Sequence, residues 1–335
     1  MATIEKNLEI ANLVCKFGEN NLLDLYKEVI EPSFFKEKFR KAGKSTFYFD
    51  QVSLTNLGKD TLGEKDIIAI TGRFIKKTIL EREQYVDNFG NILRDKQNLP
   101  SAPSAIFTLI LNNHRLLYAA ETKYAPTIDN FRSTLIYFLR NEQMNYHKSL
   151  PKEEGVDFLK RFPIVELTIT PLTNQQSLKD NIYLFDTLKK VSFILNDRNS
   201  EIDGEDMFRQ MQETLDDANG QGKFEITNKK GLNKEVIADE ARKATMQGNQ
   251  TVVLDGVDIN GNKLRIKNDD IKIRRSIQVI QNNIKATVSN MFLEFKNIIL
   301  SKEIRVKKTD VKTQKLIDNI EKLNISSIQK EEYKE

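Results

Sequence analysis

The sequence predicts an α+β protein with two mixed-sheet domains, the second of ferredoxin-like (split βαβ) type, followed by a C-terminal helical segment. Three observations lead to this prediction. Residues 103–139 have the pattern of a strand, a tight turn, a second strand and a helix. Residues 163–275 alternate short strand patterns with helix patterns. The 335 residues are also enough for two domains that each bury a core.

The first domain, residues 1–150, is built around the hairpin in this stretch. Its two runs, 106–111 and 116–120, are apolar nearly throughout. Asn112, Asn113 and His114 lie between them and tolerate the left-handed backbone that a hairpin turn needs. Because continuous apolar runs are typical of strands covered on both faces, we expect this hairpin in the middle of a large antiparallel sheet. The helix that begins after the N-cap Thr127 supplies one cover.

The other elements of the first domain follow from local patterns. Residues 7–17, 45–54 and 66–86 alternate or are rich in aromatic residues, which predicts strands. A helix is expected from Leu22 until Pro32, and a second short helix is expected from Ser33 to Lys44. Residues 141–162 are polar and contain Pro151 and Gly155, so we place the domain boundary there.

The second domain, residues 163–275, is predicted from the alternation of its elements. Strands are expected at 164–170, 191–196, 223–227 and 251–267, the last interrupted by an Asn260-Gly261 hairpin, and helices are expected at 177–190, 204–218 and 234–247.

The segment 276–335 is predicted to be a long amphipathic helix and a mobile tail. Apolar residues spaced by threes and fours define the helix over about two dozen residues. They are Ile277, Ile280, Ile284, Val288, Met291, Phe295 and Ile298. This apolar stripe needs a cover, which is either the chain itself or a second copy in a homo-oligomer.

Composition limits the class of protein. No run of about 18 apolar residues occurs, so we expect no membrane span. The single cysteine, Cys15, and the absence of a signal-peptide pattern indicate a cytoplasmic location. Acidic residues concentrate in 201–217 and basic residues in 263–275, which predicts distinct acidic and basic faces.

Basic residues on predicted strands are the candidate nucleic-acid contacts. Rows of lysine and arginine can follow a phosphate backbone, whereas the alternative is that they protect exposed edge strands from aggregation. The candidates are Arg73, Lys76, Lys77, Arg115, Lys263, Arg265, Lys267, Lys272, Arg274 and Arg275. The stacking pattern of an RNA-recognition sheet is not evident, and the choice between DNA and RNA stays open.

Catalytic candidates are few. Glu121 and Lys123 follow a central strand in the arrangement of half of a metal-dependent nuclease site, although a second acidic ligand is missing and a surface ion pair gives the same pattern. His114, in the hairpin turn beside Arg115, is either a general base, a phosphate contact or a plain turn residue. One cysteine and two distant histidines exclude a structural zinc site, and we expect no metal and no cofactor.

Several runs resemble a family of bacterial proteins of unknown function. They are NNHRLLYAAETKYAPT before a helix, FPIVELTITPL, and KFEITNKKGLNKEVIADEARKATMQGNQTVVLDGVDINGNK. Some members of that family occur in mobile-element or anti-phage defence neighbourhoods, so the resemblance implies a two-part α+β fold and a role in antiviral defence. The layout also looks like that of CRISPR RNA-processing proteins, but their glycine-rich loop near the C-terminus is absent.

Three hypotheses for function follow. The first is a bacterial accessory protein that binds nucleic acid through basic strand faces and self-associates. The second is a metal-dependent nuclease that uses Glu121 and Lys123. The third is a structural adaptor that acts on a protein partner through the C-terminal helix.

Overall fold

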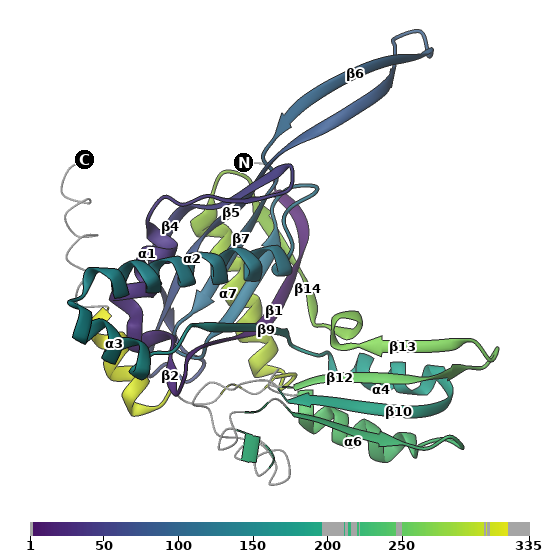
Figure 1. The fold of residues 1–335 in the computed structure, drawn as a ribbon. Coiled ribbons are helices and arrows are strands. Elements are labelled where there is room, and N and C mark those ends of the chain that lie inside the picture. Colours follow the sequence, from purple (N-terminus) through teal and green to yellow (C-terminus); the bar gives the residue numbers. More distant parts are fainter. Residues whose placement is uncertain are drawn as a thin grey trace.

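The computed structural model describes residues 3–195, 211, 214–215, 220, 222–245, 250–304, 306 and 309–320. These residues form a large unit, in which helices cover both faces of a ten-stranded sheet, and a small unit built on a four-stranded sheet. Figure 1 shows the small unit beside one end of the large sheet, and a long hairpin that projects from the opposite end. The prediction of a mixed α+β fold with a large antiparallel sheet is confirmed.

The large sheet is antiparallel throughout and places the predicted hairpin in its interior. In order across the sheet its strands are β14 (Arg274–Ile280), β1 (Thr3–Phe17), β8 (Arg115–Ala120), β7 (Ser104–Ile110), β5 (Asp66–Val86), β4 (Ser45–Lys59) and β3 (Arg40–Ala42). Three further strands pair with members of this order: β2 (Asn20–Asn21) and β9 (Glu166–Pro171) with β1, and β6 (Ile92–Ser101) with β5. The long strand β1 pairs with β14 along its first half and with β9 along its second half.

The central hairpin forms as its sequence predicts. All of β7 and nearly all of β8 are buried. His114 in the connecting turn has a φ of 53°, the left-handed conformation that the turn requires. Cys15 is also fully buried, and burial raises the pKa of its thiol to about 12. The side chain therefore acts as a small apolar residue of the core.

One face of the large sheet packs against α2 (Ile128–Ser149) through an aromatic cluster. Phe131 lies at the centre of this cluster, with its ring centroid 5.2 Å from that of Phe107, 5.4 Å from that of Phe49 and 5.5 Å from that of Phe74. Thr127 caps α2 by accepting a hydrogen bond from the backbone N–H of Asn130. The remaining helical segments of this side are η1 (Leu22–Leu25), η2 (Tyr26–Ile30), α1 (Glu31–Phe35), α3 (Lys152–Arg161) and a helix over residues 311–320.

Two predictions for the first domain are wrong. The short helix expected from Ser33 to Lys44 ends at Phe35, and the chain then forms β3. Residues 141–162 are no linker, because α2 continues to Ser149 and α3 packs against it. Phe158 of α3 is buried in the core on this side, so the polar residues of the segment cover only the solvent face.

The opposite face of the large sheet packs against α7 (Ile284–Leu300). This corrects the prediction of a helix from Ile277, since Arg274–Ile280 is strand β14 and the helix begins at Ile284. Asn283 caps α7 by accepting a hydrogen bond of 2.9 Å from the N–H of Ala286.

The apolar stripe that was a candidate for self-association is covered by the chain's own sheet. Five of its seven residues are at most 5% exposed, and Ile280 and Ile284 are half-buried. The five are Ile277, Val288, Met291, Phe295 and Ile298. An interface between two copies cannot use side chains that already lie inside one core, so the stripe is not a self-association surface.

The small unit is a two-layer sandwich. Its sheet has the order β11 (Gly222–Thr227), β10 (Phe185–Leu195), β12 (Gln250–Asp258) and β13 (Lys263–Lys267). Two helices, α4 (Gln175–Leu184) and α6 (Lys234–Thr245), pack side by side against one face of this sheet, and η3 (Asn268–Ile271) follows β13.

A ferredoxin-like fold of the small unit is not confirmed. Its three strand pairs are antiparallel, and β10 lies between β11 and β12, the two strands that α6 connects. The helix expected at 177–190 ends at Leu184, because the alternation from Phe185 onward belongs to β10. The helix expected at 204–218 falls largely on residues outside the described ranges, as does the expected mobile end of the chain.

The two units are joined by two adjacent chain crossings, which together we call the neck. On leaving β9, Leu172 donates its N–H to the carbonyl of Ile10 at 2.8 Å, and Ile273 donates to the carbonyl of Leu172 at 2.7 Å on the return. Thr173 and Lys272 form an antiparallel bridge between the two crossings. Strands β9 and β14 therefore belong to the large sheet. The sequence patterns had placed β9 in a domain of residues 163–275 and most of β14 in the segment 276–335.

The projecting arm consists of the outer part of β5 and of β6. At its tip the Asp87 carboxylate accepts hydrogen bonds from the N–H groups of Phe89 (2.9 Å) and Asn91 (2.8 Å), and Gly90 takes a φ of 85°. The tip of the β12–β13 hairpin has the same turn, with Asp258 as the acceptor. Both turns follow the pattern Asp-x-x-Gly-Asn. The arm ends on Phe89, which is 90% exposed.

Candidate nucleic-acid interface

The face of the small sheet opposite α4 and α6 carries a row of basic residues on β13. Alternation along this strand directs Leu264 and Ile266 into the core of the small unit. Lys263, Arg265 and Lys267 therefore lie on the other face, where all three are exposed. This is the strand-face arrangement that the sequence predicts for these three residues.

The register of the sheet adds two lysines from the neighbouring strands. Asp255 of β12 pairs with Arg265 on one side and with Lys190 of β10 on the other. Lys223 of β11 pairs with Ile194 of β10. Because Lys190, Ser192 and Ile194 alternate along β10, Lys223 lies on the same face of the sheet as Lys190. We call the five cations Lys190, Lys223, Lys263, Arg265 and Lys267, together with the acids among them, the basic face.

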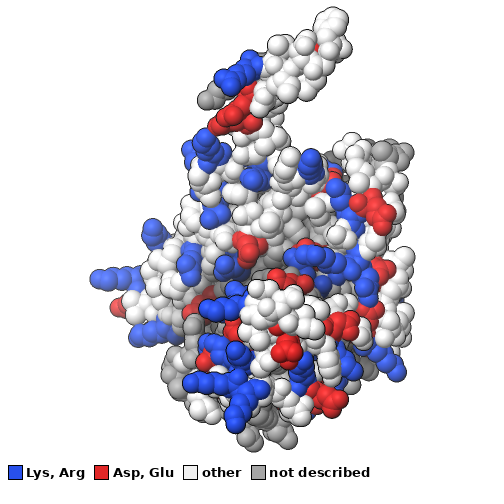
Figure 2. All heavy atoms as spheres, turned by 90° about the vertical axis from the view of Figure 1, so that its right-hand side faces the viewer, with Lys and Arg blue, Asp and Glu red and all other residues white. Residues whose placement is uncertain are grey.

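Two carboxylates partly neutralise this face. Glu225 lies 2.5 Å from Lys223 Nζ and 3.4 Å from Lys190 Nζ, and Asp255 lies 3.6 Å from the Arg265 guanidinium. The hydrogen bond from Lys223, assisted by one from Ser192, lowers the pKa of Glu225 to about 2. Among the described residues, five cations against two carboxylates leave an excess of three positive charges. In Figure 2 basic side chains are interspersed with acidic ones over the lower part of the molecule, where the small unit lies.

Lys190 and Lys223 are the members of the basic face that sequence reasoning missed. Lys223 is a single lysine within a short strand, and Lys190 is the second of a pair of lysines in β10, so neither stands in a longer basic run. They join the row on β13 only through the pairing of strands that are far apart in the sequence. The alternation of Lys223 with Phe224 and Ile226 in β11 is the one local signal that places it on the open face.

Most of the other predicted basic contacts are occupied by acidic or amide partners. Lys272 Nζ lies 2.8 Å from Glu9, and the Arg274 guanidinium lies 3.9 Å from the same carboxylate. Arg275 forms ion pairs with Glu294 and Glu303. Arg115 is 1% exposed and donates a hydrogen bond to Asn12. These residues stabilise the large unit and do not extend the basic face.

Arg73, Lys76 and Lys77 do not form one patch. Lys76 is half-buried and Lys77 is exposed, and because they are consecutive in β5 their side chains point to opposite faces. Arg73 lies on the same face as α7, where Glu121 neutralises its charge. The predicted basic row on this strand is therefore absent.

Glu121 is held in an ion pair and not in a metal site. Its two carboxylate oxygens accept hydrogen bonds of 2.8 and 2.7 Å from the Arg73 guanidinium, and Ser104 Oγ donates a third of 2.7 Å. Lys123 points elsewhere, with its Nζ 5.1 Å from the centre of the Tyr124 ring. Within the described residues no three His, Cys, Asp or Glu side chains are grouped so that they could hold a metal ion. The geometry therefore does not support a nuclease centre at Glu121 and Lys123.

His114 is a buried residue of the hairpin turn. It is 4% exposed, and its Nε2 has no hydrogen-bond partner in the described part of the chain. Burial, together with the positive charges of Arg115 and Lys16, lowers its pKa to about 4, whereas the nearby Asp310 acts in the opposite direction. A neutral imidazole without access to solvent is a turn residue and no phosphate contact.

The lowered pKa of His114 predicts acid sensitivity. The unfolded chain binds a proton at this imidazole near pH 6.5, whereas the folded chain binds it only near pH 4. Protonation therefore favours unfolding, and stability should fall as the pH drops from 6.5 towards 4. We expect the melting temperature of His114→Asn, which tolerates the left-handed backbone, to decline less over this range than that of the unaltered protein. Parallel melting curves of the two proteins would contradict the assignment.

No protein-family model matches the chain, and no curated protein matches it either. The resemblance to a bacterial family of unknown function therefore stays a prediction. Among the described helices none is both long and apolar enough to cross a membrane.

Proposed function

We propose that the protein binds nucleic acid through the basic face of the small sheet and contacts the phosphate backbone without reading the bases. The observation that supports this is the gathering of five cations from three strands on one side of one sheet. Along β13 the basic side chains recur at every second residue, about 7 Å apart. Such a row can meet successive phosphates of an extended strand.

The composition of the basic face favours backbone contacts over base recognition. The described residues between the cations are small or aliphatic, such as Ser192, Val253 and Val257. The aromatic side chains of the small sheet, Phe185, Phe193 and Phe224, all point into the core beneath α4 and α6. Without exposed rings the face cannot stack unpaired bases, which is the usual way to read single-stranded sequence.

The test is binding at several salt concentrations. We expect the protein to retain a labelled oligonucleotide on a filter, with log K falling linearly against log salt concentration. The variant with Lys263→Gln, Arg265→Gln and Lys267→Gln removes three cations. Its slope should be smaller by about 2 to 3, since each neutralised phosphate contributes roughly 0.7 to 0.9.

A matched variant separates this interface from net charge. Lys27→Gln, Lys41→Gln and Lys152→Gln also removes three exposed lysines, but from the large unit. It should bind as the unaltered protein does. The proposal fails if the protein does not bind, if binding is insensitive to salt, or if the two triple variants lose the same affinity.

A further inference from the structure

A cavity of about 690 Å³ lies between β4 and α7, on the side of the large sheet away from α2. A bulge in β4 between Asp50 and Ser53 shapes its wall. Gln51 within the bulge and Asn282 before α7 both line the cavity and both have left-handed backbone, with φ values of 50° and 60°. None of the residues assigned to the basic face contributes to it.

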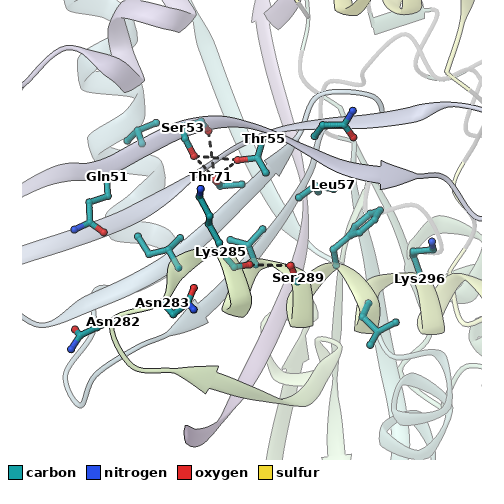
Figure 3. Close-up of a pocket in the computed structure, with 16 residues that line it drawn as sticks. Gln51, Ser53, Thr55, Leu57, Thr71, Asn282, Asn283, Lys285, Ser289 and Lys296 are labelled. Atoms are coloured by element: carbon teal, nitrogen blue, oxygen red, sulfur yellow. Dashed lines mark hydrogen bonds between the residues drawn. The ribbon is translucent and has the colours of Figure 1, made fainter. Parts of the chain in front are cut away.

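Three hydroxyl groups form a triangle on the sheet side of this cavity. Ser53 Oγ lies 3.1 Å from Thr55 Oγ1 and 3.0 Å from Thr71 Oγ1, and the two threonine oxygens are 2.9 Å apart. Figure 3 shows the three side chains converging above α7. Because a hydroxyl proton rotates freely about its C–O bond, each group can turn from its neighbour towards a ligand oxygen.

A cation faces this hydroxyl triangle. The Lys285 side chain extends from the first turn of α7 towards Ser53 and Thr71 in Figure 3. In the described part of the chain Lys285 has no ion pair and no hydrogen bond from its Nζ. The positive end of the α7 dipole lies at the same place, where it also favours an anion.

The described charges that line the cavity are positive. Among the described residues the charged members of the lining are Lys285 and Lys296, and no aspartate, glutamate or histidine is with them. Lys296 donates a hydrogen bond of 3.2 Å to the carbonyl of Lys59, so its ammonium group is already engaged. Lys285 is therefore the cation available for a ligand.

Apolar side chains form part of the wall and suit an organic body. Val288 and Phe292 project from successive turns of α7, and Val52 and Leu57 come from β4. The volume falls within the range of about 300 to 1,000 Å³ that is usual for small-molecule sites. A ligand that fits carries several anionic oxygens at one end and an apolar or aromatic body at the other.

We propose that this cavity binds a small organic phosphate, with the phosphate between Lys285 and the hydroxyl triangle and the body against Val288 and Phe292. A phosphate presents three oxygens on one side, which matches three hydroxyl donors and one ammonium group. The amides of Gln51 and Asn282 lie at the rim and can hold polar groups of the body.

The test is titration calorimetry of the full chain with adenosine 5′-monophosphate, inorganic phosphate and adenosine. We expect the mononucleotide to bind more tightly than inorganic phosphate and adenosine not to bind measurably. Lys285→Gln and Ser53→Ala should each weaken mononucleotide binding roughly tenfold, the effect of removing one hydrogen bond to a charged group. Affinity should also rise between pH 5 and 7.5, because the second pKa of a phosphate monoester is about 6.

Controls make the result unambiguous. Ser53 and Lys285 are exposed, so both variants should keep the melting temperature of the unaltered protein. Lys27→Gln, on η2 beneath α2 and so on the other side of the sheet, should bind as before. The proposal is overturned if the mononucleotide does not bind at millimolar concentration, or if Lys285→Gln and Ser53→Ala bind the mononucleotide unchanged. The variant with Lys263→Gln, Arg265→Gln and Lys267→Gln should bind the mononucleotide as before, so failure of the nucleic-acid proposal can be told apart from failure of this one.

Discussion

Replacing Glu121 with alanine is expected to lower the free energy of unfolding by about 3–5 kcal/mol, the range measured when one partner of a buried ion pair is removed. The side chains of Arg73 and Glu121 are only 13% and 9% exposed. Without the carboxylate, the Arg73 guanidinium loses two hydrogen bonds in a place with little access to water. Chemical denaturation of the purified variant measures the loss.

The exposed ion pair between Lys44 and Glu81 provides the matched control. Its N–O distance of 2.7 Å equals that of the Arg73–Glu121 pair, but its side chains are 81% and 45% exposed. Glu81→Ala should therefore cost less than about 1 kcal/mol. A nuclease centre predicts the opposite behaviour for Glu121, namely unchanged stability with lost cleavage, and that outcome would contradict the structural role.

Replacing Phe131 with alanine is expected to lower the free energy of unfolding by about 3–5 kcal/mol, as for other large aromatic residues in a core. Phe131 is fully buried, and its ring meets four other aromatic rings. Alanine leaves a cavity between α2 and the sheet, which the surrounding rings fill only in part. Urea denaturation with an unchanged m-value would show that the loss concerns stability alone.

A second aromatic residue of the same helix tests whether the effect depends on burial. Tyr137 is 45% exposed and lies on the solvent face of α2. Tyr137→Ala should cost less than about 1 kcal/mol, since surface substitutions rarely exceed this value. Equal losses in the two variants would mean that helix α2, and not the aromatic cluster, determines the stability.

The central hairpin is the part of the fold that the sequence predicts best, because all of its information is local. Asn112, Asn113 and His114 supply the turn, and the apolar runs on either side can only be strands covered on both faces. Thr127 marks the start of α2 in the same way, since a capping hydroxyl acts on its own next turn. Such features need no knowledge of the rest of the chain.

Strand β14 shows where local reasoning fails. Ile277, Ile280 and Ile284 are spaced as in a helix, but Ser276 and Gln278 are exposed and alternate with buried neighbours as in a strand. What decides between the two patterns is β1, which pairs with β14 from more than 250 residues away in the chain. The pair Asn282-Asn283 is the one local sign that a turn separates the strand from the helix.

The two proposed sites depend on register in the same manner. Lys263, Arg265 and Lys267 could be read as one face of a strand, whereas Lys190 joins them only because β10 and β12 pair as they do. The hydroxyl triangle needs the bulge after Asp50, which turns Ser53 and Thr55 to the side of Thr71. A bulge shifts every later side chain of a strand to the other face, and the sequence of β4 does not mark its position.

Because of the neck, the small unit is an insertion within the chain of the large unit. It enters after Leu172 and leaves before Ile273, and the bridge between Thr173 and Lys272 brings its two ends together. A sandwich whose ends meet can be gained, lost or exchanged during evolution with little change to the sheet that carries it. Homologues that share the large sheet are therefore expected to tolerate a different module at this position.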